Sequence, residues 1–195
     1  MSSSTTGTPL NIGIIGAGIS GLSAAIALRR SGAGHTIELF ERSSFSHETG
    51  AAIHTCPNAT RILNSWGFDF ARARAVPNER FRTSNAETLE VSSCAEYADA
   101  WDTKWYMLHR VDLHRELRRL AEEAGARIRL GAEVSAETDV EEGVVVLRNG
   151  EKIRKDVVIA ADGVHVSIQS SYTAIPQYIQ YYRQSLTRRS ILMTD

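Results

Sequence analysis

Three glycines near the N-terminus, Gly16, Gly18 and Gly21, have the spacing G-x-G-x-x-G. An apolar run at residues 10–15 precedes them, and a stretch rich in Ala, Leu and Ile follows. In this context the first glycine allows a tight turn, the second lets the backbone approach a pyrophosphate, and the third lets a helix pack closely on a strand. The N-terminus of such a helix offers unpaired N–H groups to phosphate oxygens. The stretch therefore predicts a dinucleotide-binding turn.

A carboxylate and a guanidinium follow each other at the end of the next apolar segment. Glu41 follows Gly21 by 20 residues, where a carboxylate can accept hydrogen bonds from the ribose hydroxyls of a dinucleotide. Arg42 would suit a 2′-phosphate, and an exposed arginine without a ligand explains it equally well. No Gly-Lys-Ser or Gly-Lys-Thr occurs in the sequence, which excludes the lysine-containing phosphate loop.

The elements that must position these residues form a βαβ unit. Residues 10–15 predict a buried strand, residues 19–31 a helix with one smooth face, and residues 36–40 a second strand. Gly32 ends the helix, as glycine often does. This order predicts parallel strands joined by a right-handed crossover. The predicted fold class is therefore α/β, a Rossmann-like dinucleotide-binding fold with additional strand segments and a β-hairpin.

The remaining chain alternates between short strands and helices. Residues 43–55 indicate a loop, Pro57 starts a helix that Gly67 closes, and Asn149-Gly150 predicts a two-residue hairpin turn. Residues 157–163 form a continuous apolar run ending in Asp-Gly, which is typical of a buried parallel strand. The other predicted elements are strands at 79–84, 88–93 and 104–108 and a helix at 111–124.

Composition and charge narrow the function classes. The 195 residues carry a net charge of −1, which gives no global attraction to nucleic acid or to an anionic membrane. Two cysteines, Cys56 and Cys94, form no cluster with histidine, so we expect no metal site and a reducing compartment, the cytoplasm by default. The six histidines are interpreted as surface or helix-start residues.

Three further segments resemble a known family, the single-component FAD-dependent aromatic hydroxylases related to salicylate hydroxylase and p-hydroxybenzoate hydroxylase. They are TGAAIHTCPNATRILNSWGFD (49–69), WYMLHRVDLHREL (105–117) and VVIAADGVH (157–165). With the glycine turn they occur in family order over residues 10 to about 168. The resemblance implies that Arg110 lies near the FAD pyrophosphate or ribityl chain. It also implies that Asp162 belongs to a motif serving FAD and NAD(P)H, and that Ala51 lines the flavin side of its loop.

The resemblance implies an FAD-binding, NAD(P)H-dependent monooxygenase that acts on a small aromatic substrate. The cofactor carries that chemistry, so no catalytic side chain is assigned, and the oligomeric state stays open. The implied domains are a disordered leader at 1–9, an FAD-binding domain at 10–168 and an atypical tail at 169–195. The FAD-binding domain is expected to include the first strands of a substrate domain near 79–108.

The sequence departs from the family pattern at two points. Gln169 stands near the place where the family has an arginine after its Asp-Gly motif, and no Gly-Asp pair, the family's ribityl-binding motif, occurs anywhere. The chain is therefore expected to be a truncated member. Two alternatives stay open: an NAD(P)-dependent dehydrogenase that uses the same turn, and a non-catalytic FAD-binding remnant. No tyrosine is followed four residues later by lysine, which argues against the short-chain dehydrogenases.

Overall fold

The computed structural model describes residues 8–45, 50–97 and 102–163. The tail predicted at 169–195 and most of the leader predicted at 1–9 lie outside these ranges. Four parallel strands form the central sheet, in the order β11-β1-β2-β8. Their bounds are β1 Asn11–Ile15, β2 Thr36–Glu41, β8 Arg127–Leu130 and β11 Val157–Ala160. Helix α1, Ile19–Arg30, connects β1 to β2, so the predicted α/β class and βαβ unit are confirmed.

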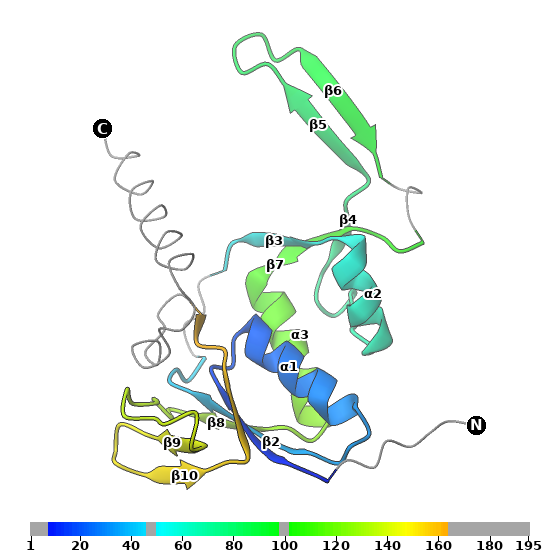
Figure 1. Cartoon of the computed structure of the whole chain (residues 1–195). Coiled ribbons are helices and arrows are strands. Elements are labelled where there is room, and N and C mark those ends of the chain that lie inside the picture. Colours follow the sequence, from blue (N-terminus) through cyan, green and yellow to red (C-terminus); the bar gives the residue numbers. More distant parts are fainter. Residues whose placement is uncertain (1–7, 46–49, 98–101, 164–195) are drawn as a thin grey trace, which may run out of the picture.

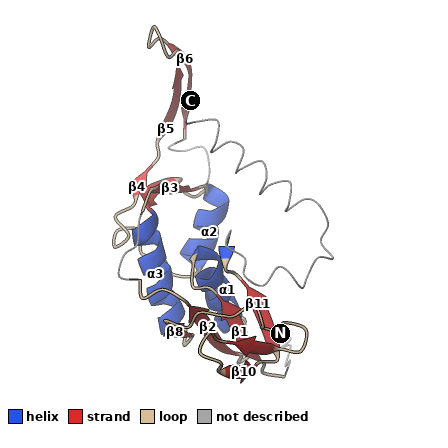
Figure 2. Cartoon of the chain, turned by 90° about the vertical axis from the view of Figure 1, so that its left-hand side faces the viewer, coloured by secondary structure: helices blue, strands red, loops and turns tan. Residues whose placement is uncertain are grey.

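Different elements cover the two faces of this sheet. Helix α1 and helix α3, Arg110–Glu123, lie on one face, and the hairpin of β9, Val144–Val146, and β10, Lys152–Arg154, lies on the other (Figures 1 and 2). Alternation along the strands explains this division. Ile37 and Leu39 pack with the helices, whereas Phe40 of the same strand packs with Val145 of the hairpin. The central strands are therefore buried on both faces.

A second, antiparallel sheet follows the order β3-β7-β4, with β3 Ala52–Thr55, β4 Val76–Pro77 and β7 Tyr106–His109. Helix α2, Pro57–Ser65, follows β3, as its N-terminal proline predicts. The prediction of a loop over residues 43–55 is wrong at its end. Ala52–Thr55 pairs with β7, more than 50 residues later in the chain, so local sequence carries little signal for this strand.

Strands β5, Arg80–Ser84, and β6, Val91–Glu96, form a hairpin that projects from the body (Figure 1). The first agrees with the strand predicted at 79–84, and the second begins later than predicted because Asn85 to Glu90 form the connecting turn. Phe81, Leu89 and Val91 are exposed on this hairpin. An isolated two-stranded hairpin is only marginally stable in water.

The β9–β10 hairpin corrects a second prediction. Its last paired residues are Val146 and Lys152, and the Leu147 N–H donates to the Glu151 carbonyl at 2.8 Å, which leaves a three-residue loop. A two-residue type I′ turn needs positive φ at both central positions. Gly150 has φ of +86°, but Asn149 does not have a positive φ. The chain therefore uses Gly150 alone for the left-handed position.

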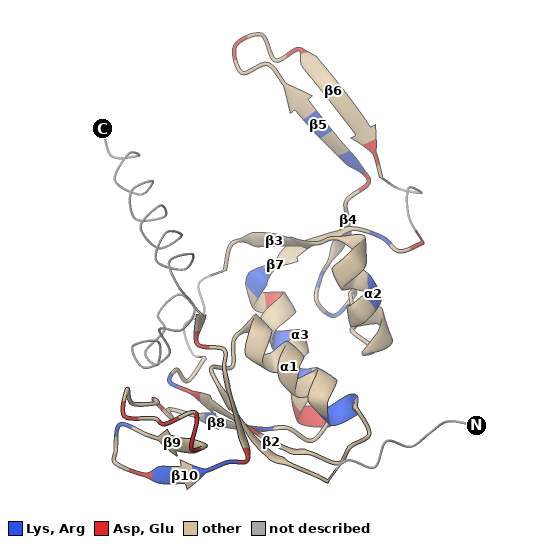
Figure 3. Ribbon diagram, viewed as in Figure 1, with Lys and Arg blue, Asp and Glu red and all other residues tan. Residues whose placement is uncertain are grey.

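Ion pairs between oppositely charged side chains join the hairpin to β8 and its following loop. Lys, Arg, Asp and Glu are interspersed along this part of the molecule (Figure 3). Arg129 donates hydrogen bonds to Glu151, and this bonding lowers the pKa of the Glu151 carboxyl. A lowered carboxyl pKa contributes stability at neutral pH that is lost as the pH falls through that pKa.

No helix among the described residues is long and apolar enough to cross a membrane.

Candidate dinucleotide-binding site

A cavity of about 500 Å³ lies at the carboxyl ends of β1, β2 and β11, where parallel α/β sheets bind ligands. The N-terminus of α1, the first residue of α3 and residues 132–134 after β8 complete its wall. Six of the eight predicted site residues line this cavity: Gly16, Gly18, Glu41, Arg42, Arg110 and Asp162. The fold therefore brings together residues that are up to 146 positions apart in the sequence.

The three glycines of the turn have different surroundings. Gly16 has φ of +94°, and a Cβ there would lie 2.6 Å from the Ala161 carbonyl oxygen. A Cβ at Gly21 would lie 2.0 Å from the Gly16 carbonyl oxygen, so this glycine lets α1 pack against the turn instead of lining the cavity. A Cβ at Gly18 would meet no atom of the described residues within 4 Å. Gly18 is the position at which a ligand can reach the backbone.

The start of α1 is prepared for an anion. Gly18 is the residue that precedes its first turn, no side chain of residues 8–45, 50–97 or 102–163 caps the helix, and the first turn holds no acidic residue. The N–H groups at a helix start have no partner within the helix, and the helix dipole places partial positive charge there. The open backbone at Gly18 and these donors therefore face the same space.

Glu41 uses one carboxylate oxygen to hold the glycine turn and the other to hold the loop after β2. Its Oε2 accepts from the Ala17 N–H at 2.9 Å, and its Oε1 accepts from the Ser43 N–H at 2.8 Å. A carboxylate has about four acceptor positions, so each oxygen keeps capacity for another donor. Glu41 thus braces the glycine turn and still presents an acceptor to the cavity.

Two arginines bring positive charge to the cavity wall. Arg42 follows β2, and Arg110 is the first residue of α3; both are exposed. The Arg110 N–H donates to the Ala51 carbonyl at 3.0 Å. Ala51 does not line the cavity that the described residues form. It fixes the backbone from which Arg110 extends.

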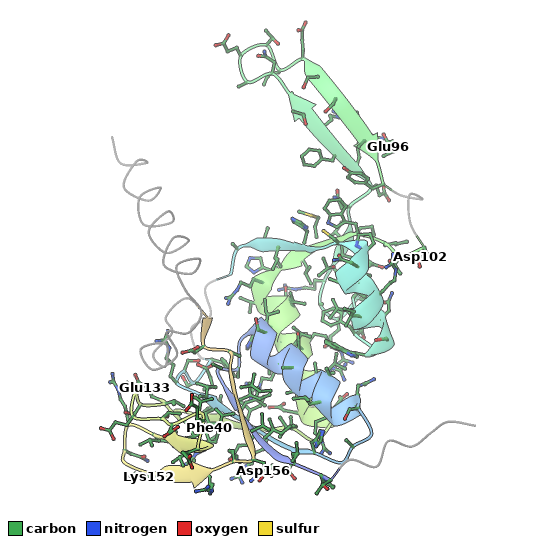
Figure 4. All side chains as sticks on the ribbon, in the orientation of Figure 1. Phe40, Glu96, Asp102, Glu133, Lys152 and Asp156 are labelled. Carbon is green, nitrogen blue, oxygen red and sulfur yellow. The ribbon has the colours of Figure 1, made fainter. Side chains whose placement is uncertain are left out.

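Sequence reasoning missed two residues near this cavity. Glu133 lies in its wall, three residues after the end of β8, and pairs with Arg148 at 3.2 Å. Figure 4 labels Glu133 together with Phe40, another residue of the cavity wall. His114 is only 4% exposed, and its Nε2 lies 2.7 Å from the Ala17 carbonyl oxygen. The interpretation of all histidines as surface or helix-start residues is therefore wrong for His114. Its position three residues before Leu117 on the apolar face of α3 was the available signal.

A parallel sheet, a glycine turn between β1 and α1, and a carboxylate at the end of β2 define a dinucleotide-binding α/β protein. The family model described as "FAD binding domain" matches residues 10–176. The chain belongs to this family of FAD-binding domains.

Named relatives agree with this assignment. The chain is 35% identical over 167 residues to hispidin-3-hydroxylase of Neonothopanus nambi, covering 82% of this chain and 39% of that protein. It is 31% identical over 169 residues to 3-amino-4-hydroxybenzoate 2-monooxygenase PtnB3 of Streptomyces platensis, covering 82% of this chain and 41% of that protein. The chain thus spans about two fifths of the length of these relatives.

Solved structures show the same fold. A tetrameric form of 2-methyl-3-hydroxypyridine-5-carboxylic acid oxygenase superposes with a TM-score of 0.68 and 28% identity, over 81% of this chain and 40% of that one. The predicted resemblance to FAD-dependent aromatic-ring monooxygenases is confirmed, and with it membership in an enzyme family. The matches do not favour the dehydrogenase alternative.

Proposed function

We propose that the cavity binds the ADP half of FAD and that the chain is part of an NAD(P)H-dependent monooxygenase acting on a small aromatic substrate. The observation that carries the proposal is the open backbone at Gly18, which lies beside the uncapped start of α1 within the cavity. The names of the relatives support the monooxygenase class.

The residues present fit FAD. The start of α1 and Arg110 suit the two negative charges of the pyrophosphate, because backbone N–H groups and a guanidinium form charge-assisted hydrogen bonds with phosphate oxygens. Glu41 suits the hydroxyls of the adenosine ribose. When bound, FAD supplies the electron transfer and oxygen chemistry of the family, and the protein supplies binding and orientation. Asp162, at the end of β11, is proposed to contact the cofactor as well.

Titration of the purified 195-residue chain with FAD and ADP tests the cofactor assignment. We expect FAD to bind with quenching of its fluorescence, and ADP to displace it, because the proposed contacts lie on the ADP half. A protein that binds NADH and leaves FAD free would contradict the proposal.

The reaction class has its own test. Oxidation of NADH and NADPH is followed in the presence of FAD, oxygen and simple phenols, together with detection of hydroxylated product. Product formation supports the monooxygenase and excludes the non-catalytic remnant. Binding of FAD without product from any phenol, in a protein that includes the remaining length of the relatives, would contradict it.

Arg110→Ala is expected to weaken FAD binding by roughly 10- to 100-fold, the range for loss of a hydrogen bond to a charged group. Arg82→Ala is the matched control, because Arg82 is an exposed arginine on the projecting β5–β6 hairpin. The control removes the same charge and should leave the affinity within about twofold, since exposed distant charges are screened. Equal affinities of both variants for FAD would show that Arg110 makes no binding contact with the cofactor.

A further inference from the structure

The peptide groups around Ala17 are held from two sides. The Ala17 N–H donates to Glu41 Oε2 at 2.9 Å. The Ala17 carbonyl oxygen lies 2.7 Å from His114 Nε2. A carbonyl oxygen only accepts hydrogen bonds, so His114 Nε2 carries the proton and donates. The residue between the first two glycines of the turn is therefore anchored to β2 and to α3.

Anchoring of the Ala17 carbonyl also directs the next N–H. The peptide bond is planar and trans, so the carbonyl of Ala17 and the N–H of Gly18 lie in one plane and point in opposite directions from the C–N bond. His114 draws this carbonyl toward α3 and the buried core. The Gly18 N–H must then point the opposite way, and Gly18 lines the cavity.

Packing holds the His114 ring in the orientation that this hydrogen bond requires. The ring is 4% exposed and makes an edge contact with Phe45 at 4.8 Å between centroids. The guanidinium of Arg118 covers the Phe45 ring at 5.2 Å. Because the imidazole lies between the glycine turn and this aromatic ring, its donor stays directed at Ala17.

We propose that His114 is a positioning residue of the cofactor site, which keeps the Gly18 N–H directed at a phosphate oxygen of the dinucleotide. The inference rests on the proposed FAD binding at this turn. Without the imidazole donor, the peptide between Ala17 and Gly18 is free to rotate. Rotation would present a carbonyl oxygen to the phosphates in place of an N–H, and a lone-pair acceptor repels an anion.

Two substitutions separate the hydrogen bond from the packing. His114→Leu fills the space without a donor, and His114→Gln places an amide N–H near the position of Nε2. We expect His114→Leu to weaken FAD and ADP binding by about 10- to 100-fold, as for a lost hydrogen bond to a charged group. His114→Gln should retain affinity within about fivefold, because it restores the donor.

A spectroscopic readout reports on the Gly18 N–H directly. In amide NMR spectra of the full chain, ADP should move the Gly18 proton downfield in the wild type and in His114→Gln, and should leave it nearly unmoved in His114→Leu. Leu120→Ala is the control for general destabilisation, since Leu120 is buried on α3 six residues beyond His114. Leu120→Ala should lower the melting temperature, because truncation of a buried side chain leaves a void in the core. It should keep FAD affinity within about threefold, because Leu120 does not line the cofactor cavity.

The outcomes distinguish failure of the proposed FAD binding from failure of the positioning role of His114. If the wild type binds neither FAD nor ADP, the proposed function fails. If the wild type binds both and His114→Leu binds them equally well, only the positioning role fails. If His114→Leu and Leu120→Ala lose affinity in proportion to their loss of stability, His114 is a packing residue and the inference is overturned.

Discussion

Gly21→Ala is expected to lose both stability and FAD binding, whereas Gly18→Ala is expected to lose FAD binding alone. At Gly21 the new methyl group would lie 2.0 Å from the Gly16 carbonyl oxygen, so α1 must move away from the turn. Overpacking of this kind costs about 3 kcal/mol. At Gly18 the methyl group meets no atom within 4 Å in the part of the chain that the structure describes, but it occupies the space that phosphate oxygens need.

The two variants control for each other, because each adds one methyl group to the same turn. Urea denaturation should place Gly18→Ala within about 1 kcal/mol of the wild type, since φ of −72° suits alanine and alanine is only a poorer helix-capping residue than glycine. FAD titration should show at least a tenfold loss for both. Wild-type affinity in Gly18→Ala would mean that the pyrophosphate does not approach the backbone at this position.

Lys155→Met is expected to destabilise the fold by about 3 kcal/mol and to leave FAD affinity unchanged. The Lys155 ammonium is buried, lying 2.8 Å from Glu38 Oε2 and 3.0 Å from Asn11 Oδ1. Removal of one partner from a buried pair leaves a charge with too little compensation. Glu38 also pairs with Arg127, whose Nε lies 3.8 Å from Glu38 Oε1 and whose side chain is largely exposed. The Lys155 backbone precedes β11, and Lys155 does not line the cavity, although its Nζ lies 5.7 Å from the ring centroid of Phe40, which does.

Glu38→Gln combined with Lys155→Met gives the matched test. The double variant has no uncompensated carboxylate and should recover at least a third of the lost stability, as replacement of a whole buried pair is often nearly neutral. Urea denaturation measures the free energy of unfolding, and FAD titration is the second readout. A double variant less stable than Lys155→Met would show that Glu38 is not destabilised by the loss of Lys155.

Local patterns predicted the βαβ unit because everything it needs lies within about 30 residues. The glycine spacing defines the turn, the helix follows directly, and Glu41 ends the next strand. The helix predicted at 111–124 is α3, displaced by one residue at each end. Its apolar periodicity was readable because one face packs on the sheet and α1.

Residues whose role depends on distant partners were not predictable in the same way. Strand β3 exists through its pairing with β7, and Glu133 reaches the cavity because β8 lies beside β2. His114 acts on Ala17, 97 positions earlier. A motif reports local conformation, whereas these contacts follow from strand order, which short segments do not encode. The assignment of residues 79–108 to the start of a substrate domain stays a prediction.

The strand order of the central sheet has a consequence for synthesis. Strand β1 pairs on one side with β2, about 25 residues later, and on the other with β11, about 145 residues later. A ribosome adding about 5 to 20 residues per second needs roughly 7 to 30 s between the synthesis of β1 and that of β11. During that interval one edge of β1 has unpaired N–H and carbonyl groups, and the wall formed by residues 161–163 does not exist. A nascent chain that already carries all three glycines is therefore still unable to close around a cofactor.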